Sequence, residues 1–234
     1  MRKLTLFLSV ISMSLFLNSC LGTGDNNLSG DRQLFYITQT EDGVQVAHNG
    51  NFIMTSSDIK MQTPNRWYII TWSWTTENGM TGTNIHNAIT PLVDEIPLGT
   101  FFLQSAPEEI TIPVLDFEFV RGIPITEGFG DFIVFQYTWN KKEGEDVNVR
   151  LYCEATEIDA TGNLVIDVRL HTPNSVTGNG KQTAGIAAVK VNTLRNLIDF
   201  GTNDYRDIQV TFRYYKTGTE KVTSFPYQLR VYKN

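Results

Sequence analysis

The sequence predicts an all-β protein with two domains, a small β-barrel over residues 31–108 and an antiparallel β-sandwich over residues 109–234. Apolar and polar residues alternate through most of the chain, as they do in strands that bury one face. Turn-forming pairs such as Asn49-Gly50 separate these segments. The proline-rich stretch from Pro91 to Pro113 favours the boundary, and a single larger sandwich is the alternative.

The N-terminus has the pattern of a secretory signal. Arg2 and Lys3 precede 14 uncharged, mostly apolar residues, Leu4 to Leu17. This run is too short to cross a hydrocarbon layer of about 30 Å. The following Leu17-Asn18-Ser19-Cys20 resembles a bacterial lipobox, in which the cysteine is lipidated and becomes the new N-terminus. An ordinary secretory signal with a chance cysteine is the alternative.

Lipidation of Cys20 would leave an acidic protein anchored to the membrane. Removing 19 residues from 234 leaves 215, and losing Arg2 and Lys3 changes the formal net charge from −6 to −8. Residues 20–30, which are polar and rich in Gly and Asn, are then expected to form a flexible tether. Cys153 would be the remaining thiol, and its place in an alternating run predicts a small buried apolar residue.

The first domain is expected to consist of short strands joined by tight turns. The longest has Tyr68, Ile70, Trp72 and Trp74 on one face, which favours core packing for both tryptophans. The expected strands are Leu34–Thr40, Val44–Ala47, Phe52–Thr55, Arg66–Thr76 and Thr83–Ile89.

The second domain shows the same alternation in longer segments. They lie at Phe132–Trp139, Val147–Ile158, Leu164–His171, Ala184–Val191, Ile208–Tyr215 and Tyr227–Tyr232. One short helical turn, capped by Asn192, is expected between Asn192 and Phe200.

The composition excludes several classes of function. A sequence pI of about 5.1 argues against nucleic-acid binding. The histidines His48, His86 and His171 lack metal-ligand spacing and are expected to be exposed, so no metal or other cofactor is expected. No catalytic motif is present. Asp116 and Glu118 could form a carboxylate pair on one strand face, but a solvated face is favoured.

The lipobox is followed along the chain by Leu34-Phe35-Tyr36-Ile37, Asp42-Gly43, Arg66-Trp67-Tyr68-Ile69-Ile70 and Val165-Ile166-Asp167-Val168-Arg169-Leu170-His171. In this order the segments resemble the NigD-like lipoproteins of Bacteroidetes-type bacteria. This resemblance implies an N-terminal OB-like barrel, a C-terminal β-sandwich and a place in the cell envelope. It implies no biochemical activity, because that family has none established.

Arginine alternates with apolar residues in four C-terminal strands, and tyrosine follows two positions later in three of them. If the four strands are neighbours, one sheet face carries cations that suit carboxylate, sulfate or phosphate groups. The alternative is a solvated face paired with Asp167 and Glu154. The residues are Arg150, Arg169, Arg213, Arg230, Tyr152, Tyr215 and Tyr232.

Trp67 completes the candidate binding residues. It points away from the face of Trp72 and Trp74, so it is the better candidate for an exposed ring that stacks on a ligand.

The sequence therefore predicts a non-catalytic protein, anchored by lipid to the outer membrane, that binds an anionic glycan or an acidic envelope partner. An immunity-type protein that sequesters a toxin is the alternative, and an unrecognised hydrolase is the third reading.

Overall fold

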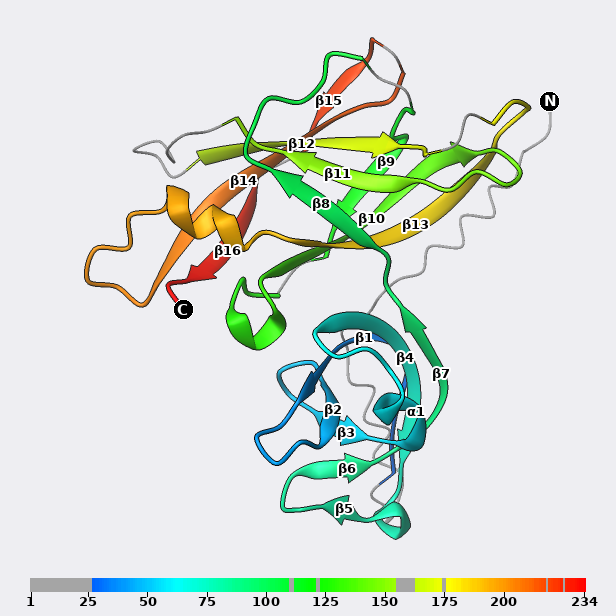
Figure 1. The fold of residues 1–234 in the computed structure, drawn as a ribbon, viewed down its shortest axis with the longest axis vertical. Helices are drawn as coiled ribbons and strands as arrows, with labels where there is room; N and C mark the ends of the chain where they lie inside the picture. Colours follow the sequence, from blue (N-terminus) through cyan, green and yellow to red (C-terminus); the bar gives the residue numbers. More distant parts are fainter. Residues whose placement is uncertain are drawn as a thin grey trace, which may run out of the picture. The chain divides into compact units, whose positions relative to one another are not determined.

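The structure is a computed structural model that describes residues 27–109, 112–120, 123–154, 163–173, 176–217, 219–224 and 226–234. The chain divides into two compact units between Glu95 and Ile96. Both units are built from strands (Figure 1), so the predicted all-β class is confirmed. The signal segment and Cys20 lie outside the described residues.

The first unit contains a seven-stranded curled sheet in the order β5-β6-β3-β2-β1-β4-β7 (Figure 1). Its elements are β1 (Leu28–Gln39), β2 (Gln45–His48), β3 (Ile53–Thr55), α1 (Ser57–Lys60), β4 (Arg66–Trp74), η1 (Thr76–Asn78), β5 (Met80–Thr81), β6 (Ile85–Asn87) and β7 (Ile89–Glu95).

The longest strands of this sheet, β1 and β4, are paired with each other. Leu28, Ser29 and Gly30 pair with residues of β4, so the predicted tether ends before residue 28. Trp72 and Trp74 are buried, as predicted. The four consecutive residues from Trp67 to Ile70 are all buried, which means that β4 is covered on both faces.

The elements between residues 57 and 102 that were not predicted from the sequence are α1, β7 and β8 (Leu98–Phe102), together with the short η1 and β5. The helix α1 is a single turn, begun by Ser56, whose Oγ accepts a hydrogen bond from the Ile59 amide at 3.0 Å. β7 contains Pro91, which is tolerated because β7 is an edge strand that pairs only with β4 in the described sheet. The strand β8 belongs to the second unit.

The second unit contains a nine-stranded sheet in the order β15-β14-β12-β11-β8-β13-β10-β9, with β16 also paired to β14 (Figure 1). Its elements are β8 (Leu98–Phe102), β9 (Asp116–Phe119), η2 (Glu127–Phe129), β10 (Phe132–Lys141), β11 (Asn148–Tyr152), β12 (Asn163–His171), β13 (Lys181–Lys190), η3 (Asn192–Leu197), β14 (Tyr205–Tyr215), β15 (Lys221–Thr223) and β16 (Tyr227–Tyr232).

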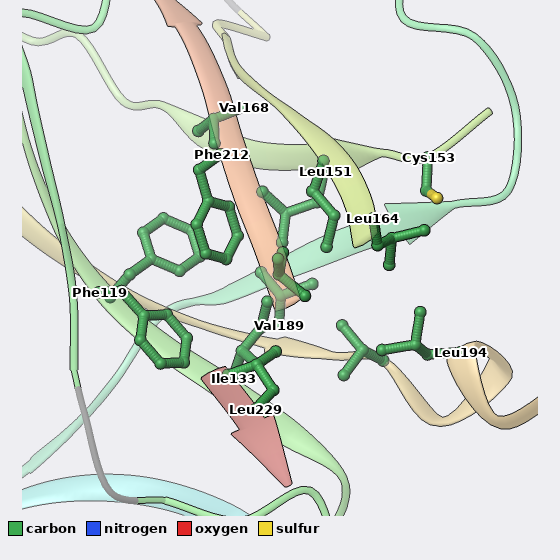
Figure 2. Packing of buried hydrophobic residues seen from close by; sticks show 14 of the residues in the cluster. Phe119, Ile133, Leu151, Cys153, Leu164, Val168, Val189, Leu194, Phe212 and Leu229 are labelled. Atoms are coloured by element: carbon green, nitrogen blue, oxygen red, sulfur yellow. The ribbon is translucent and has the colours of Figure 1, made fainter. Parts of the chain in front are cut away.

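The two ends of this sheet fold together into a sandwich around one core. Phe117 on β9 packs against Phe212 on β14, with ring centroids 4.7 Å apart. Figure 2 shows Phe119, Phe212 and Leu229 converging from different strands. Cys153 is buried in this cluster, as predicted.

β8 joins the two halves of the sandwich. Leu98 and Gly99 pair with β13, and the next three residues pair with β11. A Cβ atom at Gly99 would lie 2.6 Å from Val189 Cγ2 and 2.7 Å from the Val149 carbonyl oxygen, so the crossing needs glycine.

Three details of the prediction are corrected. The sheet is mixed, because β8 runs parallel to both β11 and β13, and β12 runs parallel to β14. Residues 96–108, predicted to belong to the barrel, lie in the second unit. Pro91 interrupts the alternation of β7, and Pro97 directly precedes the short strand β8. The predicted helical turn is the 3-10 helix η3, which begins after Val191 and has no side-chain cap.

A candidate anion-binding surface

The strand order brings three of the four predicted arginines onto one face of the second unit. β11, β12 and β14 are consecutive neighbours, and the residues that alternate with the core residues point away from the core. Arg150 lies directly opposite Arg169, and Asp167 lies opposite Arg213. We call Arg150, Asp167, Arg169, Arg213 and Tyr215 the arginine patch.

Asp167 holds the patch together. Its side chain is only 8% exposed. Arg213 donates two hydrogen bonds to it, from Nε to Oδ1 at 2.6 Å and from Nη2 to Oδ2. This hydrogen bonding raises the pKa of Arg213 above its ordinary value. Both carboxylate oxygens of Asp167 are therefore already engaged by Arg213.

Arg169 is the most buried cation of the patch, with a side chain only 12% exposed. Its Nη2 lies 3.4 Å from Asp167 Oδ1, and its Nη1 donates to the Val168 carbonyl. The guanidinium lies over the Tyr215 ring, 4.8 Å from the centroid. Its buried Nε has no hydrogen-bond partner among the described residues. The side chain is thus held in place with one donor unused.

Arg150 is half-buried, and no ion pair or side-chain hydrogen bond joins it to another described residue. Like charges directly opposite each other in an antiparallel pair are destabilising. Lys221, which pairs with Tyr215, adds a further cation beside the patch, and Glu154 adds one negative charge near Arg213. The positive charges therefore outnumber the negative ones.

Arg230 belongs to a different part of the same face. It pairs with Asp207, six residues before Arg213 on β14, or about 20 Å along a strand. Nε and Nη2 of Arg230 donate to the two oxygens of Asp207 at 2.8 and 3.0 Å. Arg230 also lies over the Tyr205 ring, whose neighbour is Tyr232. The four arginines therefore form two groups.

Two predicted binding aromatics are buried. Trp67 is only 2% exposed and packs near Tyr36, so the expectation of an exposed ring is wrong. The reason is that β4 is covered on both faces, which alternation on one face does not reveal. Tyr152 is 4% exposed and stacks on Phe102 from β8 at a centroid distance of 5.0 Å. Tyr152 therefore supports the patch from the side.

The sequence analysis missed three neighbours of the patch. Phe102 and Lys221 come from strands outside the predicted set, and alternation gives no sign of their position. His171 follows Arg169 by two residues on the same face, and its buried Nδ1 has no partner among the described residues. Its proximity to Arg169 in the sequence was the signal that could have identified it.

The histidines are half-buried rather than exposed. Burial lowers the pKa of His48, and His86 stacks on Phe52 at a centroid distance of 4.3 Å.

Within the described residues no group of three His, Cys, Asp or Glu side chains could hold a metal ion. Asp116 and Glu118 are exposed on β9, as predicted for a solvated face. No helix in the described part of the chain is long and apolar enough to cross a membrane.

No known family model and no curated protein matches this sequence. Solved structures do match its fold. A candidate lipoprotein of Bacteroides fragilis is 11% identical, with a TM-score of 0.57 over 89% of this chain and 98% of its own. A NigD-like immunity protein of Bacteroides caccae is 14% identical, with a TM-score of 0.51 over 85% and 98%.

A third structure, described as toxin-related and from Parabacteroides distasonis, is 13% identical, with a TM-score of 0.50 over 89% of this chain and 95% of its own. The resemblance to the NigD-like fold and to lipoproteins of this bacterial group, inferred from the sequence, is thereby confirmed for the fold. The identities are too low to carry function across.

Proposed function

We propose that this protein is a non-catalytic, lipid-anchored protein of the bacterial cell envelope that binds an anionic ligand at the arginine patch. One observation carries the proposal: Arg150 and Arg169 lie opposite each other while the nearest buried carboxylate, Asp167, is already held by Arg213. A carboxylate or sulfate group between the two arginines would relieve their repulsion and accept hydrogen bonds from the Arg150 guanidinium.

Anchoring at the outer membrane through Cys20 is the second part of the proposal. It is supported by the lipobox-like sequence before Cys20 and by the fold likeness to a candidate lipoprotein. Metabolic labelling with palmitate should mark the protein, and Cys20→Ala should abolish the label. Protease treatment of intact cells, with a lysed control, would then show on which side of the membrane the two units lie.

Binding at the patch can be tested with purified protein from residue 21 onward, against chondroitin sulfate, polygalacturonate and neutral dextran. We expect retention on at least one of the two anionic glycans and none on dextran. Arg150→Glu should weaken binding by about tenfold or more, since a hydrogen bond to a charged group contributes about 1.5–3 kcal/mol. The matched control Lys60→Glu changes the same charge on an exposed residue of the first unit.

Arg150 is the appropriate position for this test. Arg213→Glu would leave Asp167 buried beside a second carboxylate, and a folding defect would then imitate a loss of binding. Arg150→Met provides a milder second variant that removes the charge without reversing it. Equal binding by wild-type protein, Arg150→Glu and Arg150→Met would contradict the proposal.

An immunity-type role is the second candidate, because the fold is also that of a NigD-like immunity protein. In that case the ligand of the patch is an acidic surface of a toxin. Deletion of the gene would then sensitise cells to a bacteriocin produced by related strains, and expression of the Arg150→Glu variant would not restore protection.

A further inference from the structure

We infer that the ligand of the arginine patch is an extended anionic glycan that lies along β14, from the patch to the pair formed by Arg230 and Asp207. This inference rests on the proposed function and specifies its ligand. It follows from the outward-pointing residues between the two arginine groups, which the proposed function does not use.

The centre of this surface is a row of three amide side chains. Gln209 on β14 lies opposite Asn163 on β12 and opposite Gln228 on β16. All three residues are exposed. Amide groups donate and accept hydrogen bonds at the same time, so they match the hydroxyl groups of sugars. Thr211, the next outward residue toward the patch, adds a hydroxyl group on the same line.

Aromatic rings mark both ends of this row. At one end Tyr215 lies under Arg169. At the other end Tyr205, which is 43% exposed, lies under Arg230 and beside Tyr232, with ring centroids of the two tyrosines 5.7 Å apart. Both ends therefore combine a tyrosine with an arginine, and such pairs are favoured in recognition surfaces.

The distribution of polar groups indicates a ligand that exposes hydroxyl groups between its charged groups. The outward positions of β14 from 209 to 211 carry no charge, whereas a surplus of cations lies at the patch and the pair of Arg230 and Asp207 lies at the far end. The distance between the ends, about 20 Å along the strand, requires a ligand of several sugar units. A small anion would fill the patch and leave the amide row unused.

An acidic polypeptide fits this surface less well. Extended peptides commonly bind by adding a strand to the open edge of a sheet. β14 offers no such edge along this surface, because its backbone pairs with β12 on one side and with β16 and β15 on the other. A peptide would have to bind through side chains alone, and polyglutamate has no hydroxyl groups to exchange hydrogen bonds with the row of amides.

The experiment compares short and long ligands by calorimetry, with disaccharides and decasaccharides of chondroitin sulfate and of galacturonate, and with polyglutamate. For wild-type protein we expect the decasaccharide of at least one glycan to bind about tenfold or more tightly than its disaccharide and than polyglutamate. Gln209→Glu, which keeps the shape of the side chain but adds a negative charge, should remove most of this gain. It should leave disaccharide binding unchanged.

The control Gln182→Glu makes the same substitution at an exposed position of β13. It should change neither the affinity for the disaccharide nor the affinity for the decasaccharide. Equal affinity for short and long glycans, or a Gln209→Glu variant that binds the decasaccharide as tightly as the wild-type protein, would overturn the extended ligand. If Arg150→Glu still weakens binding in that case, the proposed function stands and only the extended ligand is overturned. Tighter binding of polyglutamate would overturn the glycan. If no anionic glycan binds the wild-type protein, the inference fails together with the glycan form of the proposed function.

Discussion

The outer face of the second unit contains two arginine–aspartate pairs with the same two-pronged geometry and different surroundings. Asp167, held by Arg213, is 8% exposed, whereas Asp207, held by Arg230, is 30% exposed. Asp167 also lies beside Arg169, and Asp207 has no second arginine of this kind among its described contacts. Because the two pairs share their hydrogen-bond geometry and differ in burial, we expect them to contribute differently to the free energy of unfolding.

Burial determines how much each ion pair contributes to stability. A charge that has left water depends on its partners, and removing one partner exposes the full cost of desolvation. An exposed charge that loses its partner recovers water instead, so the pair adds little to stability. We therefore interpret the pair at Asp167 as structural, which leaves Arg150, beside Arg169, without a carboxylate of its own among the described residues. The more exposed pair at Asp207 is the one expected to exchange its partner.

The largest effect is expected from Asp167→Ala. This substitution leaves Arg169 and Arg213 without their carboxylate, and it should lower the free energy of unfolding by about 3–5 kcal/mol. Urea denaturation, followed by tryptophan fluorescence, measures the change. The matched variant Asp207→Ala should unfold close to the wild-type midpoint, and equal losses in the two variants would contradict the comparison.

An intermediate effect is expected from Arg213→Lys. The ammonium group keeps the charge but cannot donate two parallel hydrogen bonds to Asp167, so a loss of about 1–2 kcal/mol is expected in the same denaturation assay. A wild-type midpoint for Arg213→Lys would mean that charge alone, without the two-pronged geometry, holds the patch.

Arg230→Lys makes the same change at the exposed pair and should leave the denaturation midpoint unchanged within error, because the guanidinium is already in water. A shift as large as that of Arg213→Lys would show that exposure does not separate the two pairs.

The smallest effect concerns pH. The hydrogen bonds from Arg230 hold the pKa of Asp207 below its ordinary value of 3.8. A carboxyl group with a lowered pKa in the folded state stabilises the protein above its unfolded pKa, and this contribution is lost as the pH falls through the folded value. NMR titration should give Asp207 a pKa below 3.8, and Arg230→Ala should move it back toward 3.8. An unchanged value would mean that Arg230 does not hold the carboxylate in solution.

Alternation of apolar residues predicted much of the fold. It located β4, β10, β12 and β16 to within two residues at each end, because each of these strands packs its apolar side chains into a core. It failed between Pro91 and Phe102, where β7 is an edge strand and β8 divides its pairing between β13 and β11. Strands with so few core positions give a weak alternating pattern.

The sequence predicted which residue types form the candidate site, but only part of their arrangement in space. Alternation placed Arg150, Arg169 and Arg213 on one outward face. Pairing of this face with Asp167 was anticipated as the alternative, although the sequence did not show that Arg213 is the partner. The sequence could not show that Arg230 lies apart, since this follows from the register of β14 with β16. Nor could it show that Trp67 is buried and packs near Tyr36 of β1, since alternation within β4 does not reveal this contact.

The central claim is that an anionic group binds between Arg150 and Arg169. A crystal structure of the protein from residue 21 onward, soaked with a chondroitin sulfate disaccharide, tests this claim most directly. We predict a carboxylate or sulfate group in contact with the guanidinium groups of Arg150 and Arg169, while Asp167 keeps its hydrogen bonds to Arg213. An anion bound elsewhere, with the patch unchanged from the free protein, would contradict it.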